Sequence, residues 1–431
     1  MSPLLIGLLA IIAFLVLALV GLPLGFSFIV VGFSGMYFLK GLQPALNLLG
    51  GNPYSQLASF VLCAVPLFVL MGQLSFHSGI SKQLFDAAYK VSSRLPGGLA
   101  VATMAACTGF AACTGSSIAS AATMGTIAYP EMKRHNYHSR LAAGTIAAGG
   151  TLGVLIPPST IFILLGIITE TNISALFIAG IGPGFLLAGL FMLLIIGICK
   201  TNTALGPPGE SFSLKEIISS LKGVIWMLGL FVLVIGGLYI GVFSPSEAGS
   251  IGAVGAFILA LIKRMPFSSF LDAFKDSAQI TCYMLFILIG ASIFNIFLGI
   301  AGFPSVVSNW AAGLPFPPIG IVVAMLILYI PLGMFLDTLG MILLTVPIFF
   351  PVIVQLGYDP IWFGVLICMM AELGMITPPV AINAFVVQGV TRVPMVEIFR
   401  GIIPFFIVYL IVIGLIVAFP GISLYLTKLM V

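Results

Sequence analysis

The stretch LGVLIPPSTI, residues 152–161, decides the fold of this chain. Pro157 and Pro158 lack the N–H group that a helix needs, and their rings clash with the preceding turn, so they interrupt a long apolar segment. A second stretch, LGMITPPVAI at residues 373–382, repeats the pattern L-G-x-x-x-P-P 221 residues later. The same break in two apolar segments at a fixed offset indicates an internal repeat.

The composition is that of a membrane protein. Of its 431 residues, 61% are apolar and 6% are charged, and the mean hydropathy is +1.26. A soluble globular protein carries about 25% charged residues, so these charges are too few to cover a water-exposed surface. The apolar run from Leu4 to Val20 is too long for a signal-peptide core and has no basic flank, so we expect it to remain as a first membrane helix. The six cysteines lack metal-ligand spacing and are expected to be free thiols.

Ten segments are predicted to cross the membrane, because a helix needs about 20 apolar residues to span the hydrocarbon core. They are residues 4–20, 24–40, 56–77, 140–169, 173–199, 223–242, 246–263, 279–300, 361–390 and 401–420. Two longer apolar stretches, 97–130 and 315–352, carry a polar break near the middle. We interpret both as re-entrant hairpins, which survive at this depth only where protein or a water-filled cavity surrounds them.

The positive-inside rule sets the orientation of these segments. With ten crossings and two hairpins, fourteen of the sixteen basic residues share one side, and only Lys40 and Lys428 fall on the other. That side is the cytoplasm, so both termini are expected to be periplasmic. The hydrophilic linker at 200–222 contains the capping-box pattern Ser213-x-x-Glu216 and is expected to form an amphipathic helix on the cytoplasmic surface. Residues 268–277 are expected to form a second such helix.

The repeat extends beyond the prolines. The first hairpin tip, Ser116-Ser117, falls on Asp337-Thr338 at the same offset. Because the first copy holds five crossings, the second copy enters the membrane in the opposite orientation, as in transporters built from inverted-topology repeats. We therefore predict an all-α polytopic membrane protein with two such repeats. The first spans 1–199 with a hairpin at 97–130 and a broken helix at 140–169, and the second spans 223–431 with a hairpin at 315–352 and a broken helix at 361–390.

The tips and the breaks supply groups that bind ions. Broken helices place helix ends and free carbonyls at the bilayer midplane, where carbonyls can coordinate a cation and a helix N-terminus favours an anion. Ser116 and Ser117 offer hydroxyl oxygens of the kind that a hard cation such as sodium prefers. Asp337 is a candidate for ion binding or gating, because buried carboxylates in a bilayer are costly. Simple proline kinks and close packing of small residues are the structural alternatives.

Two further polar residues of the second repeat, Asn383 and Glu372, are considered for a functional role. Asn383 follows the second proline pair and offers both donor and acceptor groups to a ligand. Its counterpart in the first repeat is Phe162, so the two broken helices are not chemically equivalent. Glu372 is the other deep acid, and the sequence leaves open whether it is functional or packs on a helix face beside a hydrogen-bond partner.

The hairpin TGSSIASAATMG and the breaks LGVLIPPS and LGMITPPVAINAF together resemble the large membrane subunit of tripartite ATP-independent periplasmic (TRAP) transporters, over essentially the whole chain. The resemblance implies an elevator-type, sodium-driven secondary transporter of the bacterial inner membrane. Its substrate would be a small carboxylate, such as sialic acid or a C4-dicarboxylate. It also implies two partners, which are a separate small four-helix membrane subunit and a soluble periplasmic substrate-binding protein, and no nucleic acid.

The resemblance also assigns roles to residues. Sodium ions, which are transported, would bind at Ser116, Ser117 and Gly153 in the first repeat and at Thr338, Gly374 and Thr377 in the second, and Asp337 is added from the sequence itself. Ser159 and Asn383 would face the substrate by the same resemblance, and Ser116, Pro157 and Pro378 are further candidate substrate contacts. A stand-alone sodium–anion symporter of the same architecture is the alternative, and a channel is less well supported. An enzyme is not expected, because the sequence has no HExxH, GxSxG or Walker-lysine motif.

Overall fold

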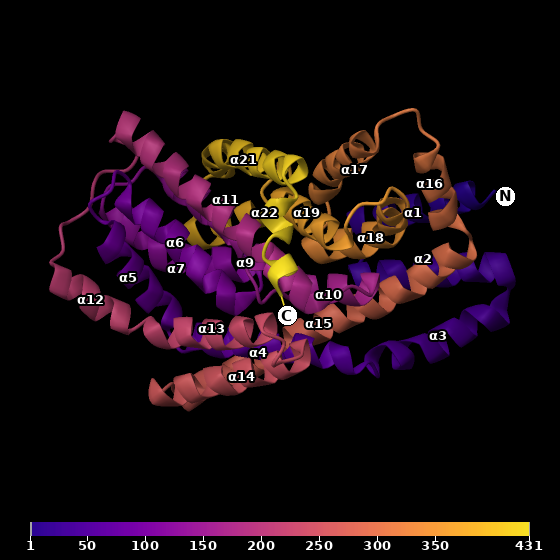
Figure 1. Ribbon diagram of the computed structural model, residues 1–431, viewed down its shortest axis with the longest axis horizontal. Coiled ribbons are helices and arrows are strands. Elements are labelled where there is room, and N and C mark those ends of the chain that lie inside the picture. Colours follow the sequence, from indigo (N-terminus) through magenta and orange to yellow (C-terminus); the bar gives the residue numbers. More distant parts are fainter. Residues whose placement is uncertain (1, 431) are drawn as a thin grey trace.

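The protein is built from α-helices and short 3₁₀ turns, and its structure is a computed structural model that describes residues 2–430 (Figure 1). The first half contains α1 (Pro3–Leu19), α2 (Leu24–Lys40), α3 (Leu42–Leu57), α4 (Ala64–His77), α5 (Ile80–Ser92), α6 (Gly98–Thr114), α7 (Ser117–Arg134), α8 (Ser139–Gly150), α9 (Leu152–Leu155), α10 (Thr160–Thr169) and α11 (Ile173–Thr201). The second half contains α12 (Leu214–Lys222), α13 (Ile225–Tyr239), α14 (Pro245–Ile262), α15 (Phe267–Ile300), α16 (Phe303–Ala312), α17 (Pro318–Gly333), α18 (Thr338–Gln355), α19 (Pro360–Gly374), α20 (Ile382–Thr391), α21 (Met395–Ala418) and α22 (Gly421–Leu424).

The helices of the second half follow the order of the first. α7 and α18 begin 221 residues apart, at Ser117 and Thr338, and α8 and α19 begin at the same offset, at Ser139 and Pro360. α10 packs against α18, while α20 packs against α7, so each broken helix contacts the hairpin of the other half. This order agrees with a duplicated architecture. The repeat boundaries at 1–199 and 223–431 and the opposite orientation of the repeats stay predictions.

Fewer helices meet the length expected for a membrane crossing than the sequence predicted. Among residues 2–430, six helical segments are long and apolar enough to cross: Phe60–His77, α11, α14, α15, α18 and α21. Two bent pairs, α8–α9 with α10 and α12 with α13, raise the number to eight. The other predicted crossings fall on shorter apolar helices, which are α1, α2 and the pair α19 and α20. α18 meets the criterion although the sequence predicted it as one leg of a hairpin, because its 18 residues span about 27 Å.

The structure tests both predicted surface helices. Around α12 the capping box is confirmed, since Ser213 N–H donates to Glu216 Oε2 at 2.8 Å and Ser213 Oγ accepts from Glu216 N–H at 3.3 Å. The Ser213 hydroxyl, which donates to Glu216 Oε2 at 2.7 Å, and the Ser213 N–H together hold the pKa of the Glu216 carboxyl below its usual range. The prediction of a separate helix at 268–277 is wrong, because these residues begin the continuous 34-residue helix α15. The helix continues past residue 277 because no glycine or proline, which could end it, lies between residues 267 and 289.

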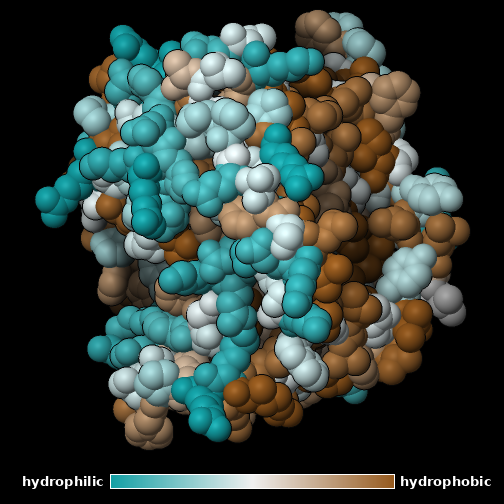
Figure 2. Space-filling model, turned by 90° about the vertical axis from the view of Figure 1, so that its left-hand side faces the viewer, coloured by the Kyte–Doolittle hydropathy of each residue, from teal (hydrophilic) through white to brown (hydrophobic). Residues whose placement is uncertain are grey.

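Hydrophilic side chains gather at one end of the molecule, as Figure 2 shows. This is the end that bears α5 and α12 in Figure 1, and it includes the exposed residues Lys82, Arg94 and Lys222. The N-terminus lies toward the opposite end. A basic end of this kind is what the predicted cytoplasmic side requires, while the side on which the termini lie stays a prediction.

Candidate functional site

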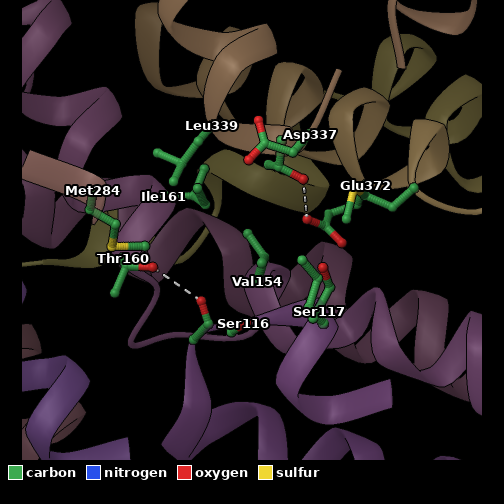
Figure 3. A pocket seen from close by; sticks show the side chains of 13 residues that line it. Ser116, Ser117, Val154, Thr160, Ile161, Met284, Asp337, Leu339 and Glu372 are labelled. Carbon is green, nitrogen blue, oxygen red and sulfur yellow. Dashed lines mark hydrogen bonds between the residues drawn. The ribbon is translucent and has the colours of Figure 1, made fainter. Parts of the chain in front are cut away.

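Both hairpin tips and the first proline break meet around one small cavity (Figure 3). The cavity has a volume of about 70 Å³, which leaves room for a few water molecules or ions. It lies between the two halves of the chain, and its lining comes from α7, α9, α10, α15, α18, α19 and the adjoining turns. The lining residues are Gly115, Ser116, Ser117, Ile118, Val154, Thr160, Ile161, Met284, Asp337, Thr338, Leu339, Glu372 and Met375.

The first hairpin tip is held tightly against the first proline break. Ser116 precedes α7, and its Oγ accepts a hydrogen bond from Ala119 N–H at 3.3 Å. Thr160, at the start of α10, donates from Oγ1 to the carbonyl oxygen of Gly115 at 3.1 Å. A methyl group on Gly153 would lie 2.5 Å from the Ser116 carbonyl oxygen, so only glycine allows this approach. The tip and the break therefore form one packed unit.

The second hairpin tip is built in a similar way. Asp337 precedes α18, and its Oδ1 accepts from Gly340 N–H at 2.8 Å. Gly333, at the end of α17, packs on Gly374, where an added methyl group would lie 2.5 Å from the Gly333 Cα. A close glycine contact thus joins each hairpin to the broken helix of its own half.

Glu372 of α19 connects the two tips. Its Oε1 accepts a hydrogen bond from Thr338 Oγ1 of the second tip at 2.8 Å, and the Ser117 hydroxyl of the first tip lies beside the same carboxylate. The side chain is fully buried, and its Oε2 has no hydrogen-bonding partner among the described residues. No basic side chain in residues 2–430 pairs with it within 4.0 Å. Because an unpaired buried carboxylate is costly, this position requires a proton or a bound cation.

The structure places the other predicted residues around the cavity rather than on its wall. Ser159 is buried and its Oγ accepts from Phe162 N–H at 3.4 Å, which caps α10. Thr377 donates from Oγ1 to the Leu373 carbonyl oxygen at 2.7 Å. Among the predicted sodium ligands, Gly153 and Gly374 serve in close packing. The roles of Ser159, Thr377 and the two glycines in binding stay predictions.

The two breaks differ in shape. The first leaves residues 156–159 between α9 and α10, whereas the second leaves residues 375–381 between α19 and α20. The peptide bonds Pro157-Pro158 and Pro378-Pro379 are both cis. Asn383 of α20 reaches the first half, where its Nδ2 donates to the Ala147 carbonyl oxygen at 3.5 Å and its buried Oδ1 has no partner among the described residues. An unpaired buried amide oxygen is available to a ligand donor.

Nine of the thirteen lining residues were not singled out as site residues from the sequence, and Thr160, Met284 and Glu372 illustrate why. Thr160 directly follows Ser159, so the polar pair Ser159-Thr160 after the prolines was an available signal. Met284 comes from the middle of α15, where nothing in its local pattern marks it. Glu372 was recognised as a deep acid, but its link to both tips depends on packing between the halves.

The donor set of the cavity consists of oxygen atoms. In the part of the chain that the structure describes, no three His, Cys, Asp or Glu residues are placed to hold a metal ion together. The available ligands are hydroxyls, two carboxylates and the backbone carbonyls at the tips and breaks. Oxygen ligands of this kind suit a hard cation. The helices α7, α10 and α18 begin at the cavity, and helix N-termini favour negative charge.

Comparison with known proteins identifies the relatives of the chain. A family model described as "Tripartite ATP-independent periplasmic transporter, DctM component" matches residues 11–422. The chain is 35% identical over 367 residues to the C4-dicarboxylate TRAP transporter large permease protein DctM of Pseudomonas aeruginosa, covering 85% of this chain and 86% of that protein. It is 29% identical over 422 residues to the sialic acid TRAP transporter large permease protein SiaM of Vibrio cholerae, covering 97% and 98%.

A solved structure shares the fold. The chain superposes with a TM-score of 0.62 on MtrF of Neisseria gonorrhoeae, which represents a class of antimetabolite efflux pumps, over 97% of this chain and 95% of that one. The sequence identity is 14%, so this likeness concerns the fold alone. The all-α polytopic fold predicted from the sequence is confirmed. Because the relatives are named as transporter permeases, the prediction that the chain is not an enzyme is confirmed as well.

Proposed function

The chain belongs to the DctM component family of TRAP transporters, and we propose that it is the large membrane subunit through which sodium ions drive the import of a small organic acid. As a multi-span transporter of this family it lies in the inner membrane. The observation that carries the proposal is the meeting of two hairpin tips, with their hydroxyl and carboxylate oxygens, at one buried cavity between the halves of the chain. Sodium would bind at these oxygens, with one ion near each tip.

The proposed substrate is a carboxylate. Relatives of this chain are named for C4-dicarboxylates and for sialic acid, and both ligands carry carboxylate groups. The cavity lining contains no lysine or arginine, so the N-termini of α7, α10 and α18, together with bound sodium, would supply the positive potential. Ser116, Pro157, Ser159, Pro378 and Asn383 remain the proposed substrate contacts.

The transporter is proposed to act as one of three components. A small four-helix membrane subunit and a soluble periplasmic binding protein would complete the system, and an elevator movement of the hairpins and broken helices would carry the site across the membrane. The termini would be periplasmic and the 200–222 linker cytoplasmic. The alternative is a stand-alone sodium–anion symporter, which the likeness in fold to a transporter of another class keeps open.

Uptake into proteoliposomes tests the proposal. The full chain is reconstituted with its small subunit, and uptake of radiolabelled C4-dicarboxylates and sialic acid is measured with and without the cognate binding protein, under sodium or proton gradients. We expect uptake only with both the binding protein and a sodium gradient. Saturable uptake by the chain alone would favour the stand-alone symporter. Uptake that follows a proton gradient in sodium-free buffer would refute sodium coupling and make Asp337 or Glu372 the leading proton carrier.

A further inference from the structure

An apolar groove lies beside the first hairpin, away from the cavity at the tips. It has a volume of about 500 Å³ and runs between α5, α6, α11 and the junction of α12 with α13. On the α6 side the groove is lined by short apolar side chains, including Val101, Ala105 and Ala112, which share one helix face. Its opposite wall includes Met227 of α13, and the groove is lined almost wholly by apolar atoms.

The dimensions of the groove match one leaflet of a bilayer. Its α6 wall extends from Val101 to Ala112, which is about 16 Å at 1.5 Å per residue. The hydrocarbon core of a bilayer is about 30 Å thick, so one leaflet contributes about 15 Å. The groove begins at Leu95 near the hydrophilic end of the molecule and reaches Ile156 at the first proline break. An acyl chain that enters from the leaflet at that end would fill its length.

The mouth of the groove is basic. Segments 80–95 and 210–224, which form it, carry five basic and three acidic residues. One of the acids, Glu216, is engaged in the capping box of α12. Arg94 and Lys222 are exposed and are the chain neighbours of the lining residues Leu95 and Leu221. A phosphate at the mouth would therefore meet positive charge.

The junction of α12 and α13 shapes this mouth. The two helices are bent by 50° at residues 223–224, with α12 carrying the exposed apolar side chains Leu214 and Ile218. An amphipathic helix with such a face lies in the interfacial region of a membrane, at the depth of the lipid headgroups. Lys263, which directly follows α14, also reaches the junction, where its Nζ donates to Gln83 Oε1, and the Gln83 side chain lies against Gly223.

From these observations we propose that the groove binds an anionic phospholipid, with one acyl chain along α6 and the phosphate at Arg94 and Lys222. The lipid belongs to the leaflet at the basic end of the molecule. It contacts α6, a leg of the first hairpin, on one side and α13 on the other. The site is separate from the cavity at the tips and does not depend on the identity of the transported substrate.

Photolabelling of the full chain in mixed phosphatidylcholine and phosphatidylglycerol vesicles tests the site. Two lipid probes carry the same photoactivatable diazirine on the acyl chain and differ only in headgroup, and labelled peptides are identified by mass spectrometry. We expect the phosphatidylglycerol probe to label the groove walls on α6 and α13 in preference to the phosphatidylcholine probe. Each basic side chain near a membrane surface contributes roughly fivefold to anionic lipid binding, so Arg94→Ala with Lys222→Ala should reduce this preference about thirtyfold.

Matched variants distinguish lipid labelling in the groove from labelling by the lipids that surround the whole protein. The control pair Lys133→Ala with Lys275→Ala removes exposed basic residues elsewhere and should leave labelling of the groove unchanged. Ala105→Phe fills the groove and should abolish labelling there, whereas Val254→Phe, on an exposed face of α14, should not. Equal labelling by both probes, labelling that persists in Ala105→Phe, or loss of labelling when a partner subunit occupies the groove would overturn the proposal.

Discussion

Replacing Gly153 by alanine should weaken sodium coupling through a small displacement of the first hairpin tip. The added methyl carbon would lie 2.5 Å from the Ser116 carbonyl oxygen and 2.6 Å from Ser120 Oγ. Ordinary contact of such a carbon begins at 3.4 Å, so the carbonyl must retreat by about 0.9 Å, the difference between 3.4 and 2.5 Å. Binding sites tolerate displacements of only about 0.5 Å, and an error of about 1 Å can cost a hundredfold in function.

The assay is uptake as a function of sodium concentration in proteoliposomes, together with the thermal unfolding of the purified protein. We expect the sodium concentration for half-maximal uptake to rise at least roughly tenfold and the variant to lose about 1–3 kcal/mol of stability from overpacking. The matched control is Gly389→Ala, in α20, where a methyl group meets no atom within 4 Å. It should keep its sodium dependence and gain slightly in helix stability.

The reasoning fails if Gly153→Ala folds with the wild-type unfolding temperature and the wild-type sodium dependence. In that case the contact between the tip and the break would not position any ion ligand. A loss of stability with an unchanged sodium dependence would also count against the site, because it would show that the contact is purely structural.

Three further predictions concern other parts of the chain. Glu372→Gln keeps the hydrogen bond from Thr338 but removes the charge, so it should abolish sodium-dependent uptake. Thr338→Val should only raise the half-saturating sodium concentration. Normal coupling in Glu372→Gln would show that the carboxylate is dispensable. Asn383→Ala should raise the half-saturating substrate concentration while leaving the sodium dependence unchanged, and the reverse pattern in uptake assays would contradict the substrate role. Single cysteines at Ser211 and Asp359 are introduced in a background without the exposed Cys63 and Cys282. The cysteine at Ser211 should react with impermeant thiol reagents from the cytoplasmic side, and the cysteine at Asp359 should react from the periplasmic side. Periplasmic reaction at Ser211 would overturn the topology.

Local chemistry made several features predictable from the sequence. The proline pairs mark the breaks, because proline removes a helix donor wherever it stands. The hairpin turns follow from the polar stretches at 112–117 and 334–338, since the structure ends α6 at Thr114 within the first stretch and α17 at Gly333 directly before the second. The capping box of α12 is likewise a local pattern over four residues, Ser213 to Glu216. Each of these signals lies within one turn of the structure that it specifies.

Features that depend on packing between the halves were not predictable in this way. Glu372 is 34 residues from Thr338 and 255 from Ser117 in the sequence, and no periodicity brings the three together. Asn383 lies against Ala147 of the first half, although the repeat pairs it with Phe162. The continuity of α15 was missed because its charged start, residues 268–277, is typical of a surface helix, while the apolar remainder is typical of a crossing.

The contacts around Glu372 predict coupling between the two proposed sodium sites. Within each half, a glycine contact fixes the hairpin to its broken helix, and across the halves α10 packs on α18 and α20 on α7. Separation of the two tips would therefore disturb the surroundings of the Glu372 carboxylate, which accepts a hydrogen bond from Thr338 and lines the same cavity as Ser117. A sodium ion at either proposed site would stabilise the same buried charge and the same arrangement of the hairpins. Binding of the first sodium ion should then assist binding of the second, because the ordering is already complete, and such coupling is reciprocal. A steep dependence of uptake on sodium follows, and it should flatten when Glu372 is replaced.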